Sequence, residues 1–125
     1  MNERPAGTIE GVAGVILTTD RFEEMLRFYR DTLGLPPRHV RDGFVNFEWG
    51  GFRLTISTHS EVHGGNLDPA RVILNLAVSD IHAAHERLRA AGVEFSRPPA
   101  RERWGWVATL RDADGNTLQL MQFDD

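Results

Sequence analysis

Apolar residues in the first third of the chain form a continuous run and then a helical stripe. Residues 12–17 are continuously apolar and partly β-branched, which predicts a buried strand. Apolar side chains then recur at helical spacing, so we expect a helix over about residues 21–33 with one stripe toward a core. Gly34 and Pro36-Pro37 end this helix, because glycine accepts the left-handed cap and proline cannot continue a helix. The stripe consists of Phe22, Met25, Leu26, Tyr29 and Leu33.

Two strands and a tight turn follow the helix. Residues 44–49 and 52–58 flank Gly50-Gly51, a dipeptide that suits a two-residue hairpin turn. With that turn Glu48 lies opposite Arg53, and one face of the hairpin is wholly apolar. The other face is mostly polar and is suited to line a binding site. Its side chains are Phe44, Asn46, Glu48, Arg53, Thr55 and Ser57.

The same order of elements returns in the second half of the chain. We expect, in turn, a strand over 72–78, a helix from Ile81 that ends at Gly92, a short strand over 93–95, and a hairpin of 106–110 with 117–123. Each half therefore consists of a strand, a helix and three strands. These boundaries predict a flexible arm over residues 1–11 and one domain over 12–125, built of modules at about 12–62 and 70–125.

The composition limits the possible partners. The chain has 125 residues, no cysteine, and fourteen basic against eighteen acidic residues, which gives a net charge of −4. Without cysteine it has no disulfide, thiolate metal site or cysteine nucleophile. This charge balance disfavours nucleic-acid binding, which depends on clustered positive charge, and no apolar stretch is long enough to span a bilayer. We therefore expect a cytoplasmic protein whose partner is a small molecule, with no nucleic acid and no membrane.

Two short motifs add a family resemblance. Residues 28–31 read Phe-Tyr-Arg-Asp ahead of Leu33-Gly34, and residues 112–116 read Asp-x-Asp-Gly-Asn. With the doubled order of elements, they resemble the vicinal oxygen chelate superfamily of glyoxalases, extradiol dioxygenases, fosfomycin-modifying enzymes and metal-free bleomycin-binding proteins. The resemblance implies an α+β fold of two tandem βαβββ modules that form a curved mixed sheet with a concave cup and helices on the convex face. It also implies a homodimer.

The superfamily's metal ligands are missing at the matching positions. In metal-using members, a His or Gln in the first strand of each module and a Glu in the last strand hold a divalent ion in the cup. The matching residues here offer no set of three ligands, since they are Ala13 or Gly14, Thr55, Ile73 and Gln119. Other histidines lie in a glycine-rich loop, with Glu61 between them, or on the second helix, at His59, His63, His82 and His85. We therefore expect no metal and no cofactor.

The predicted cup is apolar with scattered hydrogen-bonding groups, which suits a small, largely apolar ligand. Trp104 follows three charged residues and is a candidate for an aromatic lip over the opening. We expect ligand contacts from Phe44, Asn46, Glu48, Arg53, Thr55, Ser57, Asn75, Trp104, Gln119 and Met121.

Three functional hypotheses remain open from the sequence. The first is a metal-free binding protein, similar in type to the bleomycin-binding branch. The second is a lyase or dioxygenase-type enzyme with a displaced metal site, or with Glu48 as acid or base and Arg53 orienting it. The third is a structural or regulatory dimer whose cup is filled by side chains.

Overall fold

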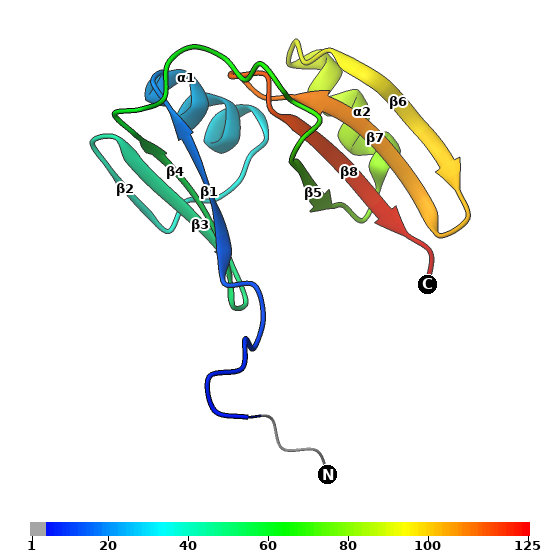
Figure 1. The fold of residues 1–125 in the computed structure, drawn as a ribbon. Coiled ribbons are helices and arrows are strands. Elements are labelled where there is room, and N and C mark those ends of the chain that lie inside the picture. Colours follow the sequence, from blue (N-terminus) through cyan, green and yellow to red (C-terminus); the bar gives the residue numbers. More distant parts are fainter. Residues whose placement is uncertain (1–4) are drawn as a thin grey trace.

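The computed structural model describes residues 5–125, which form two four-stranded mixed sheets of the same topology (Figure 1). The strand order is β1-β4-β3-β2 in the first sheet and β5-β8-β7-β6 in the second. In each sheet, the first strand of the module pairs in parallel with the last. Each module is therefore a βαβββ unit, and the predicted α+β fold of two tandem modules is confirmed.

The elements follow the predicted order. The first module comprises β1 (Gly14–Thr19), α1 (Phe22–Leu26), the π-helix η1 (Arg27–Thr32), β2 (His39–Arg41), β3 (Phe44–Trp49) and β4 (Phe52–Thr58). The second comprises β5 (Ile73–Ala77), α2 (Ile81–Ala90), β6 (Phe95–Glu102), β7 (Gly105–Arg111) and β8 (Thr117–Phe123). Residues 5–13 precede β1 and lead away from both sheets (Figure 1). Residues 1–4 of the predicted arm lie outside the described residues.

The glycine turn between β3 and β4 sets the register of the first sheet. Gly50 has a φ of 56°, a left-handed conformation that favours glycine. Trp49 then pairs with Phe52 and Glu48 with Arg53, as the sequence predicts. Side chains alternate between the two faces of the sheet from this point onward.

Three elements differ from the sequence-based expectation, the first being β2, to which the sequence analysis assigned no residues. The helix over 21–33 changes after Leu26 to a π-helical turn, in which the Leu33 N–H donates to the Phe28 carbonyl at 2.8 Å. The strand expected over 93–95 is instead β6, which runs through Pro98-Pro99 to Glu102. Proline is tolerated there because β6 is an edge strand that needs hydrogen bonds on one side only.

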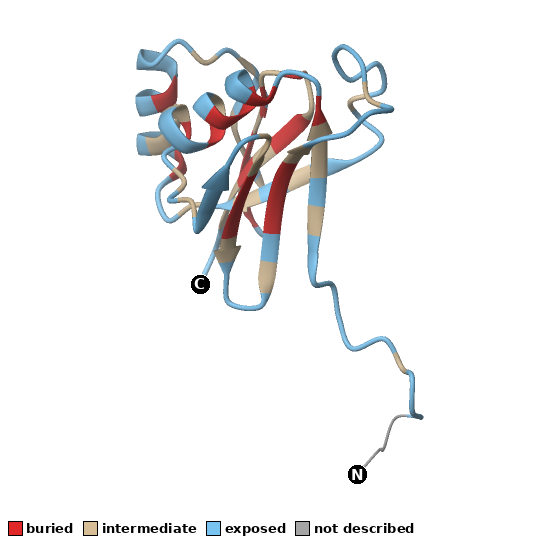
Figure 2. Cartoon of the chain, turned by 90° about the vertical axis from the view of Figure 1, so that its left-hand side faces the viewer, coloured by how far each residue is buried: buried red, intermediate tan, exposed pale blue. Residues whose placement is uncertain are grey.

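The helices cover one face of each sheet and join both modules into a single core. Buried side chains of α1 and η1 pack with Phe47 and Leu54 of the first sheet, and the same cluster continues to Leu110 and Leu118 of the second. Figure 2 shows the buried residues gathered between helices and strands, while the outer sides are exposed. None of the helices within residues 5–125 is long and apolar enough to cross a membrane.

A buried hydrogen bond connects the modules at the centre of this core. The hydroxyl of Tyr29 in η1 donates to Oδ2 of Asp112, in the turn after β7, at 2.6 Å. Asp112 also accepts from the backbone N–H groups of Asp114 and Asn116, both at 2.9 Å. Arg21 adds a second link between modules, because its guanidinium pairs with Asp114 at 3.2 Å. The Asp112 carboxylate thus orders its own turn and holds the first module against it.

Tyr29 is also a well-isolated titrating group. Burial raises the pKa of its hydroxyl well above the ordinary value, and the negative charge of Asp112 raises this pKa further. It is the single tyrosine of the chain, and every one of the fourteen basic residues is arginine. No lysine, cysteine or second tyrosine therefore titrates near the ordinary tyrosine pKa of about 10.

We predict that Tyr29→Phe destabilises the fold by about 1–3 kcal/mol at neutral pH, because the buried Asp112 carboxylate loses a donor. Above a pH of about 10 the unfolded chain gives up the tyrosine proton while the folded chain keeps it, so the wild-type free energy of unfolding falls as pH rises. The Tyr29→Phe variant has no tyrosine proton to lose, so its free energy of unfolding does not fall for this reason, and the difference between wild type and variant shrinks as pH rises. Urea unfolding at neutral and alkaline pH measures both effects. A wild-type curve that parallels the variant's across this range would contradict the assignment.

Candidate functional site

The polar face of the first sheet is the side that α1 and η1 do not cover. It carries all six side chains that the sequence places there, and neighbouring pairs lie directly opposite each other across β3 and β4. Asn46 and Thr55 form the buried centre of this face, at 4% and 8% exposure. Asn46 also fastens the edge strand, because its Oδ1 accepts the backbone N–H of His39 at 3.1 Å.

One carboxylate on this face lies between two guanidinium groups. Oε2 of Glu48 is 3.4 Å from Nη2 of Arg53 and 3.6 Å from Nε of Arg38. The Glu48 side chain is 24% exposed, whereas both arginine side chains are more than half exposed. Such solvated ion pairs stabilise a fold by only about 0–1 kcal/mol. These three side chains therefore matter more for the charge that they give to the face than for the stability of the fold. Glu48 is engaged as an ion-pair partner, and its suggested acid or base role stays a prediction.

A pocket of about 490 Å³ opens beside this ion pair. Glu48, Arg53 and Thr55 form its polar wall, and β1, which pairs with β4 in the same sheet, forms the adjoining wall. Ile16 of β1 is 64% exposed and gives that wall an apolar surface. The pocket therefore combines hydrocarbon with charged and hydroxyl groups within one small volume. Its lining is Ala13, Gly14, Val15, Ile16, Glu48, Gly51, Arg53 and Thr55.

The other four predicted site residues belong to the second sheet. Asn75 of β5 pairs in register with Gln119 of β8, and Met121 follows two residues later on the same face. Trp104 lies between β6 and β7, where its ring packs against Phe123 with centroids 5.2 Å apart. Trp104 is 38% exposed, which places it at the rim of this sheet.

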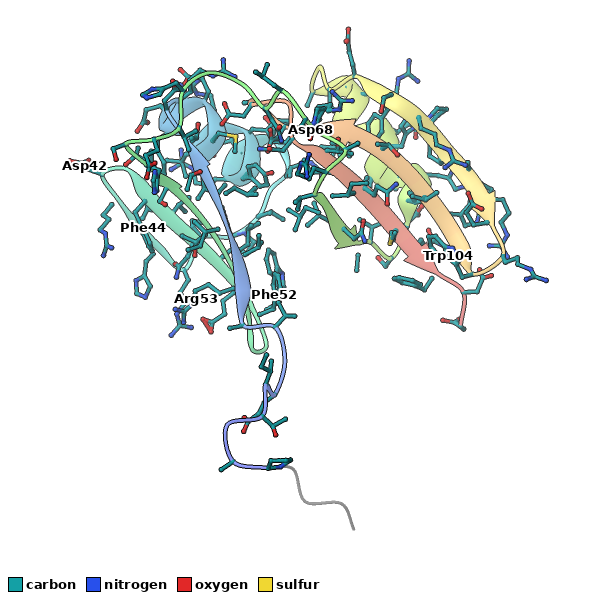
Figure 3. The ribbon with its side chains drawn as sticks, viewed as in Figure 1. Asp42, Phe44, Phe52, Arg53, Asp68 and Trp104 are labelled. Atoms are coloured by element: carbon teal, nitrogen blue, oxygen red, sulfur yellow. The ribbon has the colours of Figure 1, made fainter. Side chains whose placement is uncertain are left out.

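The predicted residues thus lie on two surfaces of one chain. Figure 3 shows Phe44 and Arg53 on the side of the first sheet that faces away from the second, with Trp104 at the far end of the second sheet. Glu48, Arg53 and Thr55 line the pocket beside β1, whereas Asn75 lines pockets between the two sheets.

These pockets between the sheets form a central groove that the sequence did not indicate. They measure about 360 and 410 Å³ and share Phe52, Leu74 and Asn75. Phe52 points toward the second sheet, opposite to its neighbour Arg53 (Figure 3). Trp49 also lines the groove and remains 44% exposed. The apolar face of the hairpin therefore extends past the helix that packs on it.

The residues at the superfamily's metal positions do not fit a divalent ion. A side chain at Gly14 would have its Cβ 2.0 Å from the Arg53 carbonyl oxygen, so no ligand can stand there without a shift of the strand. Thr55, Ile73 and Gln119 supply one hydroxyl and one amide. Within residues 5–125, no group of three or more His, Cys, Asp or Glu side chains is arranged to hold a metal.

The histidines make local contacts instead. Nδ1 of His59 accepts the backbone N–H of Glu61 at 3.0 Å, within the loop between the modules. His82 and His85 of α2 pack edge-on against Trp106 and Phe95, with ring centroids 4.7 and 4.5 Å apart. These side chains thus belong to a loop turn and to the contact between α2 and its sheet.

Solved structures of similar fold include both binding proteins and enzymes. TnmS3, an antibiotic binding protein from Streptomyces sp. CB03234, superposes with a TM-score of 0.76 at 22% identity over 93% of this chain and 98% of that one. A lactoylglutathione lyase from Agrobacterium tumefaciens gives 0.70 at 18% identity over 91% and 94%. A glyoxalase/bleomycin resistance protein/dioxygenase from Nocardioides gives 0.70 at 24% identity over 98% and 86%. These identities show a shared fold alone.

Sequence comparison adds a relative and a family. An uncharacterized protein of Shewanella frigidimarina (strain NCIMB 400) is 36% identical over 61 residues, which are 49% of this chain and 45% of that protein. The chain therefore matches less than half the length of this relative. A family model matches residues 11–120, nearly the whole of both modules. By this match and the doubled βαβββ topology, the chain belongs to the Glyoxalase/Bleomycin resistance protein/Dioxygenase superfamily.

Proposed function

We propose that this chain is a metal-free binding protein that holds a small, largely apolar molecule against the polar face of its first sheet. The pocket beside Glu48 and Arg53 carries this proposal, because it joins the exposed Ile16 surface to three polar side chains in about 490 Å³. Ligand pockets of this kind bury hydrocarbon and use a few polar groups to fix orientation.

The residue chemistry favours binding over metal-assisted catalysis. The superfamily fold is shared by an antibiotic binding protein and by a lyase, so the fold does not decide between these functions. The superfamily's metal would polarise substrate oxygens, which needs at least three protein ligands to hold it. The amide of Gln119 and the hydroxyl of Thr55 do not provide that set.

A second copy of the chain is the protein partner that the strand edges favour. Within residues 5–125, β1 and β5 each have one hydrogen-bonded neighbour. Neither strand contains a charged residue or a proline, the usual protection of an edge against pairing. A two-fold dimer would pair β1 of each copy with β5 of the other and satisfy both edges at once. It would also bring the polar face of one first sheet beside that of the partner's second sheet.

N-phenyl-1-naphthylamine, a neutral aromatic dye that fluoresces in apolar sites, tests the binding function. We expect saturable binding by the wild-type protein and at least about a tenfold weaker affinity for Ile16→Glu, which puts a charge on the apolar wall. Ile16 is exposed, so this change should leave the fold of each chain intact, and light scattering of the variant separates loss of the ligand from loss of the pairing expected at β1. Leu67→Glu, at a 99% exposed loop position, is the matched control and should bind like wild type. Equal affinity of Ile16→Glu and wild type would refute the location of the site.

Metal binding separates this proposal from the enzyme hypothesis. We expect stoichiometric zinc, nickel or iron(II) to leave the melting temperature unchanged within error, because a ligand stabilises a fold only when it binds the folded state. Differential scanning fluorimetry with each ion, and with EDTA as control, measures this. A rise of several degrees in the melting temperature at a stoichiometric concentration of one of these ions would contradict the metal-free assignment.

The dimer is tested at the edge of β5. Ile73→Lys adds a charge to a 42% exposed edge position, so we expect it to shift the protein from dimer to monomer. Val40→Lys adds the same charge at a 46% exposed position of β2, the opposite edge of the first sheet from β1, and should remain dimeric. Light scattering coupled to size-exclusion chromatography gives the mass in each case. A wild-type monomer at high micromolar concentration would contradict the expected pairing.

A further inference from the structure

The polar face of the first sheet is positively charged in a protein of opposite net charge. Arg38, Arg41 and Arg53 lie at this face with Glu48 as the carboxylate that two of them share. The chain as a whole has a net charge of −4. We propose that the bound molecule is an organic anion with a planar apolar body, and that Arg53 pairs with its negative group. This inference rests on the proposed binding function and names the ligand class of the same site.

Arg53 has the position and the freedom to make that contact. Of the two guanidinium groups beside Glu48, Arg53 is the one that lines the pocket. Its 3.4 Å contact with Glu48 is long for a charge-assisted hydrogen bond, and 56% of its side chain is exposed. Because Arg38 reaches the same Oε2 atom, Glu48 stays paired when Arg53 turns to a ligand. A planar guanidinium matches the two oxygens of a carboxylate or sulfonate in a fork.

The surroundings of Arg53 suit the flat apolar part of such a molecule. Gly14 lies directly opposite Arg53 in the parallel pairing of β1 with β4, so no side chain stands over the sheet at that point. Ile16 follows two residues later on the same face and offers its exposed aliphatic surface. At the other end of this face, the Arg41 guanidinium already lies 4.2 Å from the ring centroid of Phe44. On this face, guanidinium groups thus already pair with a carboxylate, at Arg53, and stack on an aromatic ring, at Arg41.

Glu48 then acts as a selectivity element rather than as an acid or base. A carboxylate at the edge of the pocket repels an incoming anion and competes with it for Arg53. Removing its charge should therefore strengthen anion binding, whereas removing the charge of Arg53 should weaken it. The two substitutions are predicted to change the affinity in opposite directions, which general loss of folding would not do.

Two dyes with the same aromatic skeleton separate charge recognition from apolar binding. 8-Anilinonaphthalene-1-sulfonate carries one sulfonate, and N-phenyl-1-naphthylamine is its neutral counterpart. We expect the wild-type protein to bind the sulfonate more tightly, and this preference to shrink when NaCl is raised from about 0.02 M to about 0.5 M. Arg53→Gln should weaken sulfonate binding about tenfold and change neutral-dye binding less than twofold. Glu48→Gln should strengthen sulfonate binding alone.

Arg30→Gln serves as the matched control. Arg30 is an exposed arginine of η1 that pairs with Asp31, on the helical side of the first sheet. Its loss should leave both affinities unchanged. A ratio of sulfonate to neutral affinity that Arg53→Gln does not alter would overturn the anion assignment and leave the binding function standing. Failure of the wild-type protein to bind either dye would overturn the binding function itself.

Discussion

The carboxylate of Asp112 organises the contact between the two modules, because it accepts hydrogen bonds from its own turn and from the first module at once. Oδ1 accepts two backbone N–H groups of its own turn, while Oδ2 accepts both the side-chain amide of Asn116 in that turn and the hydroxyl of Tyr29 from the first module. A buried carboxylate needs several donors to offset the loss of water. The turn and the π-helix are therefore held together, beside the hydrophobic cluster that both sheets share.

The two faces of the first sheet differ in chemistry: one is apolar and the other carries charged and polar side chains. Phe52 and Arg53 are consecutive residues of β4, yet one lines the apolar groove between the sheets and the other lines the charged pocket. This separation results from strand alternation, which sends neighbouring side chains to opposite faces. Apolar contact with the helices thus occurs on one side, while the other side stays open for the ligand that we propose.

Local patterns predicted the parts of the fold that depend on nearby residues. The Gly50-Gly51 turn determined which residues pair across the hairpin, and the alternation around it predicted the polar face correctly. The path of β6 through Pro98-Pro99 was missed, because proline indicates an interruption unless the strand is known to be an edge. The exposure of Trp49 was also missed. The strands β3 and β4, of six and seven residues, extend about 20 Å, while the eleven residues of α1 and η1 rise only about 16 Å. The helices are therefore too short to cover the end of the hairpin where Trp49 lies.

Contacts between distant residues were beyond local patterns. Tyr29 and Asp112 both belong to motifs that the sequence analysis noted, but they are 83 positions apart and their hydrogen bond depends on how the modules pack. The direction in which the polar face of the first sheet points relative to that of the second sheet also depends on how the modules pack. The six predicted site residues of β3 and β4 do share one face of the first sheet, whereas the division of the ten between two surfaces was not foreseen, and their part in binding stays a prediction.

The close approach of β1 to β4 at Gly14 has an evolutionary consequence. Even a methyl group at this position would meet the backbone oxygen of Arg53 at 2.0 Å. A histidine or glutamine at this position is not tolerated as a single substitution, since the strands must first move apart and give up pairing along β1. A change of the exposed Arg53 side chain meets no such obstacle, so the charge of this face can vary in evolution more readily than a metal ligand can arise at position 14.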